Sequence, residues 1–196
     1  MKHRSVRRVL RLALLTAAVL TVMLPALPHT AAAQVHVGKD SATRLLRLGR
    51  DLMYGTAEGL AFAGYDQLTN DPPEWGKGWS GYGKRAASNI GEFYIQESAT
   101  EGLAALMDRP LDYTRCPCHE THSRIAWALH GIYADEMPNG THPLAVPRIV
   151  GAYLGSFAQA SWRPAHGNSR ARVALLNGTT SLAIGGLINL YHEFVH

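Results

Sequence analysis

Glycines inside helix-spaced segments constrain the fold of this chain more than any other feature. Apolar residues recur every three or four positions along most of the chain, which is typical of α-helices, and the strict alternation of β-strands is rare. Each glycine inside a helix costs about 0.5–1 kcal/mol relative to alanine. A compensating gain is therefore needed, and close packing of helix backbones supplies it. The glycines concerned are Gly49, Gly55, Gly59, Gly64, Gly91, Gly102, Gly131, Gly151, Gly155, Gly178, Gly185 and Gly186.

The sequence predicts an all-α fold, a bundle of about five glycine-rich helices. Asp71-Pro72-Pro73 ends the first helix, and Pro138-Asn139-Gly140 is a turn that follows the third. Pro147 is favoured in the first turn of the fourth helix. The expected helices cover about residues 41–68, 86–107, 121–133, 147–162 and 169–196.

Residues 74–85, between the first two helices, are rich in glycine and aromatic side chains. We interpret this stretch as a connector whose aromatic side chains cover the core. The alternative is a platform for a carbohydrate or another ligand, built from Trp75, Trp79 and Tyr82.

Two helices carry small residues at a spacing that suits close contact. Gly151 and Gly155 form a G-x-x-x-G pair, and Gly178, Ser181 and Gly185 follow a similar pattern. Such faces are frequent between membrane helices, but polar residues interrupt the apolar run at 173–191. We interpret the small faces as tight packing in a soluble protein, with membrane-surface association as the alternative.

The first 33 residues have the organisation of a secretory signal peptide. A basic start at 1–11 precedes a mostly apolar run at 12–27, and Thr30-Ala31-Ala32-Ala33 supplies the small residues of a cleavage site. An uncleaved anchor is the alternative, but the run is shorter than a spanning helix needs. We expect cleavage before Gln34, a single helical domain at 34–196, and a location in the periplasm or at the outer membrane.

Removal of the signal peptide reverses the sign of the net charge. The whole chain has 19 basic and 15 acidic residues, and the signal carries five of the basic ones and no acidic one, which leaves a net charge of −1. The mature chain has no cluster of lysine and arginine of the kind that binds nucleic acid. We therefore expect no nucleic-acid partner.

The two cysteines lie in Cys116-Pro117-Cys118-His119, in a chain expected to be exported. Three states remain open for them: thiols that are free or linked between molecules, ligands of a metal such as zinc or copper(I), and a local disulfide. The first is favoured, because one intervening residue makes a very small ring.

The last residues of the chain, His192, Glu193 and His196, spell H-E-x-x-H, which on a helix can hold zinc beside a general base. A catalytic zinc needs three protein ligands, so a third would have to come from upstream, with Cys118 or Cys116 the best donor. Peptide deformylases have a similar combination, but they are built around sheets. The terminal turn of a helix also frays. No cofactor is therefore expected, and a zinc hydrolase with Glu193 as base is the alternative.

Six segments, taken in order, resemble a family of exported bacterial proteins of unknown function, common in acidobacteria and some proteobacteria. The resemblance covers about residues 70–194, although the family usually has D-P-R-Y where this chain has Arg109-Pro110-Leu111-Asp112-Tyr113. It implies that Glu193 and Phe194 belong to a shared structural pattern and that His192 and His196 are incidental. The segments are 73–76, 81–85, 109–113, 147–153, 162–164 and 189–194.

These observations together predict an exported protein of the cell envelope that acts as a structural or interaction module. The expected partner is another envelope protein or a membrane surface. At the terminus, Phe194 is expected to be the residue that matters for stability, because it offers apolar area to bury.

Overall fold

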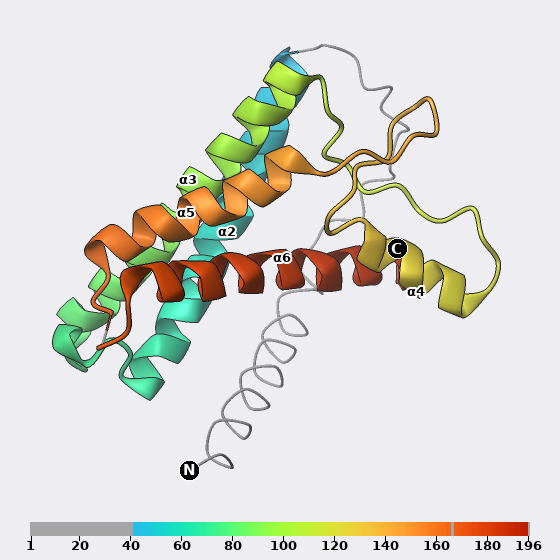
Figure 1. Ribbon diagram of the computed structural model, residues 1–196. Helices are drawn as coiled ribbons and strands as arrows, with labels where there is room; N and C mark the ends of the chain where they lie inside the picture. Colours follow the sequence, from blue (N-terminus) through green and yellow to red (C-terminus); the bar gives the residue numbers. More distant parts are fainter. Residues whose placement is uncertain (1–40, 166, 196) are drawn as a thin grey trace. The chain divides into compact units, whose positions relative to one another are not determined.

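The computed structural model describes residues 41–165 and 167–195, and this part of the chain is all-α, as predicted (Figure 1). One isolated bridge pairs Ala134 with Leu144. The predicted signal peptide and His196 lie outside the described residues. The helices are α2 (Ser41–Thr69), the 3-10 helix η2 (Pro73–Trp75), α3 (Trp79–Met107), α4 (Thr121–His130), α5 (Val146–Trp162) and α6 (Arg170–Phe194).

The largest difference from the sequence prediction is the start of α3, which begins at Trp79 instead of near residue 86. The glycines at the start of α3 suggested a loop, but Gly81 is buried in the first helical turn for a steric reason. A Cβ atom at Gly81 would lie 2.6 Å from the carbonyl oxygen of Trp75. The backbone of α3 therefore approaches the preceding turn as closely as only glycine permits. Helix α4 also ends earlier than predicted: it stops at His130 instead of near residue 133, and a turn follows.

The helices pack in the series α2, α3, α5, α6, α4, with α5 in the middle. α3 packs against both α2 and α5, α5 also packs against α6, and α4 packs against α6. Figure 1 shows α4 beside the C-terminal part of α6. Asn189 of α6 donates a hydrogen bond to the carbonyl oxygen of Ala128 in α4 (3.2 Å), and Gly186 lies against Ile132 in the turn after α4.

The G-x-x-x-G pair of α5 lies against α3, as the sequence predicts. A Cβ atom at Gly155 would lie 2.9 Å from both the Cβ of Gln96 and the carbonyl oxygen of Glu92, and one at Gly151 would overlap Thr100. In α6 the prediction is right for Gly178, which lies against Tyr153, and wrong for Gly185, which meets nothing; Gly186 makes the second contact. Gly49, Gly64 and Gly102 also face open space.

The interior contains small and polar side chains. Aside from proline, every buried apolar side chain in the described part of the chain is alanine. Large apolar side chains such as Leu46, Met53, Leu154 and Leu176 are exposed. This distribution follows from the close helix contacts, because helices whose backbones nearly touch leave no room for a leucine between them.

Buried polar side chains pair with one another across the helix contacts. Ser156 of α5 donates to the carboxylate of Glu92 in α3 (2.8 Å). Gln159 accepts from Asn177 of α6 (3.1 Å), and its amide nitrogen lies 3.3 Å from Oδ1 of Asn89 in α3. Hydrogen bonds between buried side chains thus link α3, α5 and α6, as buried polar groups require.

Substitution of Gly155 by alanine tests the close contact of α5 with α3. The new methyl would collide with backbone and Cβ atoms that cannot rotate away, so Gly155→Ala should lower the free energy of unfolding by about 1–3 kcal/mol. Gly64→Ala is the matched control, because it faces open space within a helix and should raise stability by about 0.5–1 kcal/mol. Urea unfolding measures both. A gain in stability for both variants would contradict the packing.

Candidate functional site

Glu193, the proposed general base of the H-E-x-x-H pattern, is almost fully buried at the end of α6, with 1% of its surface exposed. Three groups donate hydrogen bonds to its carboxylate. The hydroxyl of Tyr113 (2.8 Å) and the backbone N–H of Cys116 (3.0 Å) bind Oε2, and Nε of Arg124 binds Oε1 (2.6 Å). Arg124 also donates to the backbone carbonyl of Glu193. Glu193 therefore joins α6 to α4 and to the segment between α3 and α4.

The pKa of Glu193 is lowered by these contacts. Burial acts in the opposite direction and by itself raises the pKa of the carboxyl. The hydrogen bonds from Arg124, Cys116 and Tyr113, together with the positive charge of Arg124, outweigh burial. The same carboxylate raises the pKa of Tyr113, in addition to the effect of burial there. Glu193 is thus held as an ionised acceptor whose oxygens are already occupied.

The neighbouring residues of the pattern have other positions. The carbonyl oxygen of His192 accepts from Nε of Arg115 (2.9 Å), and the His192 ring lies edge-on to Tyr191. The expectation that Phe194 is the buried anchor of this end is wrong, because Phe194 is exposed. The guanidinium of Arg124 lies 4.5 Å from the centre of the Phe194 ring. The acid is buried and the aromatic ring covers the arginine that binds it.

Cys116 and Cys118 form a disulfide, the least favoured of the three states considered from the sequence. Their segment does lie against the end of α6, as the zinc alternative requires of an upstream cysteine. The contact, however, is made by the backbone N–H of Cys116 and not by a sulfur atom. Within 41–165 and 167–195 no group of three histidine, cysteine or acidic side chains is arranged to hold a metal ion.

A second buried polar site explains the aromatic and glycine-rich stretch. The Arg85 side chain is fully buried and donates to the carbonyl oxygens of Asp71 (2.9 Å), Gly76 (2.6 Å) and Pro72 (2.7 Å), and to Oε1 of Gln67 (2.7 Å). These bonds hold the turn between α2 and α3 onto the first turns of α3. The interpretation of this stretch as a connector fits the turn that ends at Gly76.

The aromatic side chains of this stretch do not gather on one surface. Trp75 lies under the guanidinium of Arg163, 5.9 Å from it, whereas Trp79 is exposed in the first turn of α3 and packs edge-on with Tyr82. Arg163 also pairs with Asp66 (3.1 Å) and with Asp71 (3.3 Å). Trp75 thus belongs to the junction of α2, η2 and α5.

Carboxylates face one another between α2 and α3. Burial, followed by the negative charges of Asp51, Glu101 and Glu58, raises the pKa of Glu97 to about 7, against a hydrogen bond from Gln96 that lowers it. Glu101 lies near two arginines of α2, but neither of its oxygens has a hydrogen-bond partner in the described part of the chain. The contact between these helices therefore includes acidic groups that resist ionisation.

Sequence reasoning missed the arginines that organise these sites. Arg124 and Arg163 have no charged residue next to them, and Arg85 follows only Lys84, so no short chemical motif marks these arginines. The signal that was available is position, since Arg85 and Arg163 fall within the segments that carry the family resemblance and Arg124 does not. Their partners are backbone carbonyls and acids up to 97 positions away in the chain, as for Arg163 and Asp66, and such partners cannot be read from local spacing.

Comparison of the chain with protein-family models, curated proteins and solved structures finds no match. The site therefore has to be interpreted from its own geometry. That geometry fits a structural role at Glu193 and at Arg85, because both carboxylate oxygens of Glu193 and all three guanidinium nitrogens of Arg85 form hydrogen bonds within the chain.

Neutralising Glu193 tests its role as an anchor. Glu193→Gln removes the charge that Arg124 binds and should lower the free energy of unfolding at pH 7 by about 1.5–3 kcal/mol. The pKa of Glu193 is lower in the folded protein than in the unfolded chain. The stability that its carboxylate contributes to the wild type is therefore present above the unfolded-state pKa and is lost as the pH falls through the folded-state pKa. The difference in the free energy of unfolding between the wild type and Glu193→Gln should therefore shrink at acidic pH, which urea unfolding measures.

Glu120→Gln is the control for Glu193→Gln, because Glu120 is an exposed acid near the same segment, and its effect should stay within about 0.5 kcal/mol. Equal effects of the two substitutions would contradict the anchor. If a chelator lowers the melting temperature of the wild type as much as Glu193→Gln does, the zinc alternative is favoured instead.

Glu97→Gln tests the acidic contact between α2 and α3. The folded-state pKa of about 7 exceeds the ordinary value of 4.5, so the stability linked to this group is fully present below 4.5 and lost as the pH rises through 7. Glu97→Gln should therefore stabilise the protein at pH 8 and change little at pH 5, measured by urea unfolding. A variant that is destabilised at pH 8 would show that the ionised carboxylate is favourable.

Proposed function

We propose that the mature chain is an exported protein of the cell envelope that acts as an interaction module on a membrane surface. The observation that carries this proposal is the outer face of α6. From residue 173 to residue 191 this helix has no charged side chain, and its residues Leu176, Ala183 and Leu187 are exposed at a spacing that places them on one face.

Two hydroxyls of α6 form hydrogen bonds within the helix itself, and that of Thr179 also lies 3.1 Å from the hydroxyl of Tyr153 in α5. The hydroxyl of Thr179 donates to the carbonyl oxygen of Leu175 (2.7 Å), and that of Thr180 donates to Leu176 (2.9 Å). In a helix that faces lipid, polar groups need hydrogen-bond partners within the protein, because no water is present to bind them. On a surface that binds a protein partner, such hydroxyls would more often be free to form hydrogen bonds with that partner.

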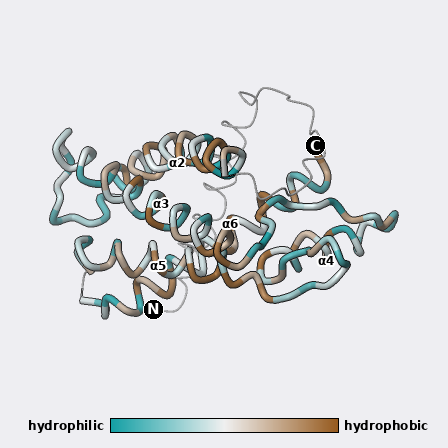
Figure 2. Tube along the Cα trace, turned by 90° about the horizontal axis from the view of Figure 1, so that it is seen from above, coloured by the Kyte–Doolittle hydropathy of each residue, from teal (hydrophilic) through white to brown (hydrophobic). Residues whose placement is uncertain are grey.

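The apolar surface continues from α6 onto α5, which packs against it. Val150, Leu154 and Phe157 are exposed along α5 at helical spacing, and Figure 2 shows hydrophobic stretches along both helices. Arg170 and Arg172 are exposed at the start of α6, where their charges suit anionic headgroups. A lipid surface therefore matches both the apolar face and its basic end.

By length and composition α6 is long and apolar enough to cross a membrane, and 17% of its most apolar window is buried. Its other side, however, packs on α5 along one part and on α4 along another. Helix α5 binds the carboxylate of Glu92 through Ser156, and helix α4 carries Arg124, which pairs with Glu193. We therefore favour a helix that lies in the membrane surface, with one face on lipid and one on the protein.

Vesicle flotation tests the proposal. The mature protein should float with vesicles of phosphatidylethanolamine and phosphatidylglycerol, and the double variant Leu176→Asp, Leu187→Asp should lose at least tenfold in bound fraction. Leu68→Asp is the control, because it places the same charge at an exposed leucine of α2 and should bind as the wild type does.

Each alternative has its own outcome. Flotation that is equal for all three proteins would contradict a lipid role for α6. A stable dimer without lipid that the double variant dissociates would identify a second copy as the occupant. Melting temperatures of the variants should match that of the wild type, because the substituted leucines are exposed.

A further inference from the structure

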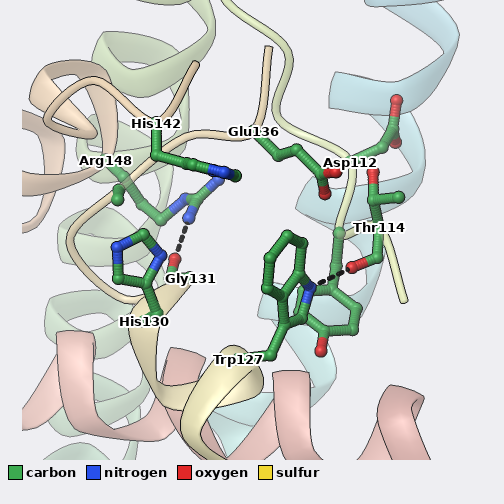
Figure 3. A pocket seen from close by; sticks show the side chains of 10 residues that line it. Asp112, Thr114, Trp127, His130, Gly131, Glu136, His142 and Arg148 are labelled. Carbon is green, nitrogen blue, oxygen red and sulfur yellow. Dashed lines mark hydrogen bonds between the residues drawn. The ribbon is translucent and has the colours of Figure 1, made fainter. Parts of the chain in front are cut away.

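A small cavity lies between α4, the start of α5 and the loops on either side of α4. It is partly open to solvent and has a volume of about 30 Å³, enough for about one or two water-sized groups. Figure 3 shows the side chains of Trp127, His142, Glu136 and Arg148 converging on it from α4, from the loop after it and from α5. Nothing in the anchor at Glu193 or in the surface of α6 accounts for this cavity.

The charges around the cavity leave one acid uncompensated. Asp112 pairs with Arg47 (2.9 Å), and Arg148 pairs with the buried Asp135 (3.4 Å). Arg148 also donates to the carbonyl oxygen of Gly131, which fixes its guanidinium. Arg109 also acts on Asp135, whose pKa burial raises and the charges of Arg148 and Arg109 lower. No ion pair of Glu136 is recorded among the described residues, so Glu136 is the acid beside the cavity without a cationic partner there.

Glu136 also has an unused acceptor. Its Oε2 atom is buried and has no hydrogen-bond partner in the part of the chain that the structure describes. A buried carboxylate oxygen without a donor is unfavourable, and such groups normally have a protein, water or ligand partner. The cavity beside Glu136 provides the space for a donor.

Aromatic rings form the walls beside this acid. The planes of Trp127 and His142 meet at 86° with their centres 5.4 Å apart, and those of His130 and His142 meet at 84°. Trp127 is fixed in orientation, because its Nε1 donates to the carbonyl oxygen of Thr114 (2.9 Å). Rings at right angles around a cavity offer π-faces to a cation.

We propose that this cavity binds a small primary ammonium group, with Glu136 as its counter-ion and Trp127 as its aromatic wall. The ammonium supplies the donors that Oε2 of Glu136 lacks and the charge that balances it. A trimethylammonium group exceeds the cavity, and an anion would meet the unpaired carboxylate. The group belongs either to a free amine or to an ethanolamine headgroup of a lipid.

An NMR titration of the mature protein with ethanolamine tests the site, with the indole N–H signal of Trp127 as the readout. Ethanolamine should shift this signal saturably, whereas ethylene glycol, which has a similar size and no charge, should not. Choline should not bind. Glu136→Gln should weaken ethanolamine binding at least tenfold, and Glu120→Gln, an exposed acid near α4, should leave it unchanged.

Each result of the titration either supports or overturns the ammonium site. Equal shifts with ethylene glycol, or unchanged binding by a folded Glu136→Gln variant, would overturn the site; if that variant does not fold, the comparison of the two ligands on the wild type decides. Competition by phosphatidylethanolamine but not phosphatidylcholine vesicles would support the lipid source, and saturable binding without competition would support a free amine. Failure to bind ethanolamine would overturn this site alone, since flotation tests the surface of α6 separately.

Discussion

The contact between the backbones of α5 and α3 at Gly151 and Gly155 governs the rest of the structure. Helices that approach this closely have no room for large apolar side chains between them, so alanine, serine and glycine lie at these contacts and no leucine of the described residues is fully buried. The hydrophobic effect per residue is small for alanine. Stability therefore depends to an unusual degree on backbone proximity and on hydrogen bonds between buried polar groups.

Buried charges at the ends of the helices complete this arrangement. Glu193 holds the end of α6 through three donors, Arg85 holds the turn after α2 through carbonyl oxygens, and Arg163 joins α2 to α5. Each charge is matched by several partners, which is the condition under which a buried charge is tolerated. The helices are thus positioned by their ends as much as by their faces.

The sequence predicted the helices, most of their ends and the close contact at Gly155, because helical spacing, proline and glycine act through local geometry. It did not predict the start of α3, because Gly81 and Gly83 suggest a loop unless the carbonyl oxygens of the preceding turn are known to lie nearby. At the terminus the H-E-x-x-H pattern drew attention to Glu193 as a general base, and the structure shows its carboxylate bound by three hydrogen-bond donors. Its partners Tyr113, Cys116 and Arg124 are far away in the chain, and only the fold brings them together.

The hydrogen bonds of Arg85 have a consequence for how the turn at residues 71–76 can change. Three of its four partners are backbone carbonyl oxygens, which every amino acid possesses. Arg85 therefore binds the backbone of the turn, and its hydrogen bonds do not depend on most of the side chains there. Substitutions in the turn should leave the hydrogen bonds of Arg85 intact whenever the path of the chain is kept, although Asp71 and Trp75 also contact Arg163 through their side chains. Arg85 and Gly81 themselves admit no replacement of similar shape and donor capacity. Arg85 and Gly81 thus fix the path of this corner, and Gly76 supports it with a positive φ of 70° that favours glycine.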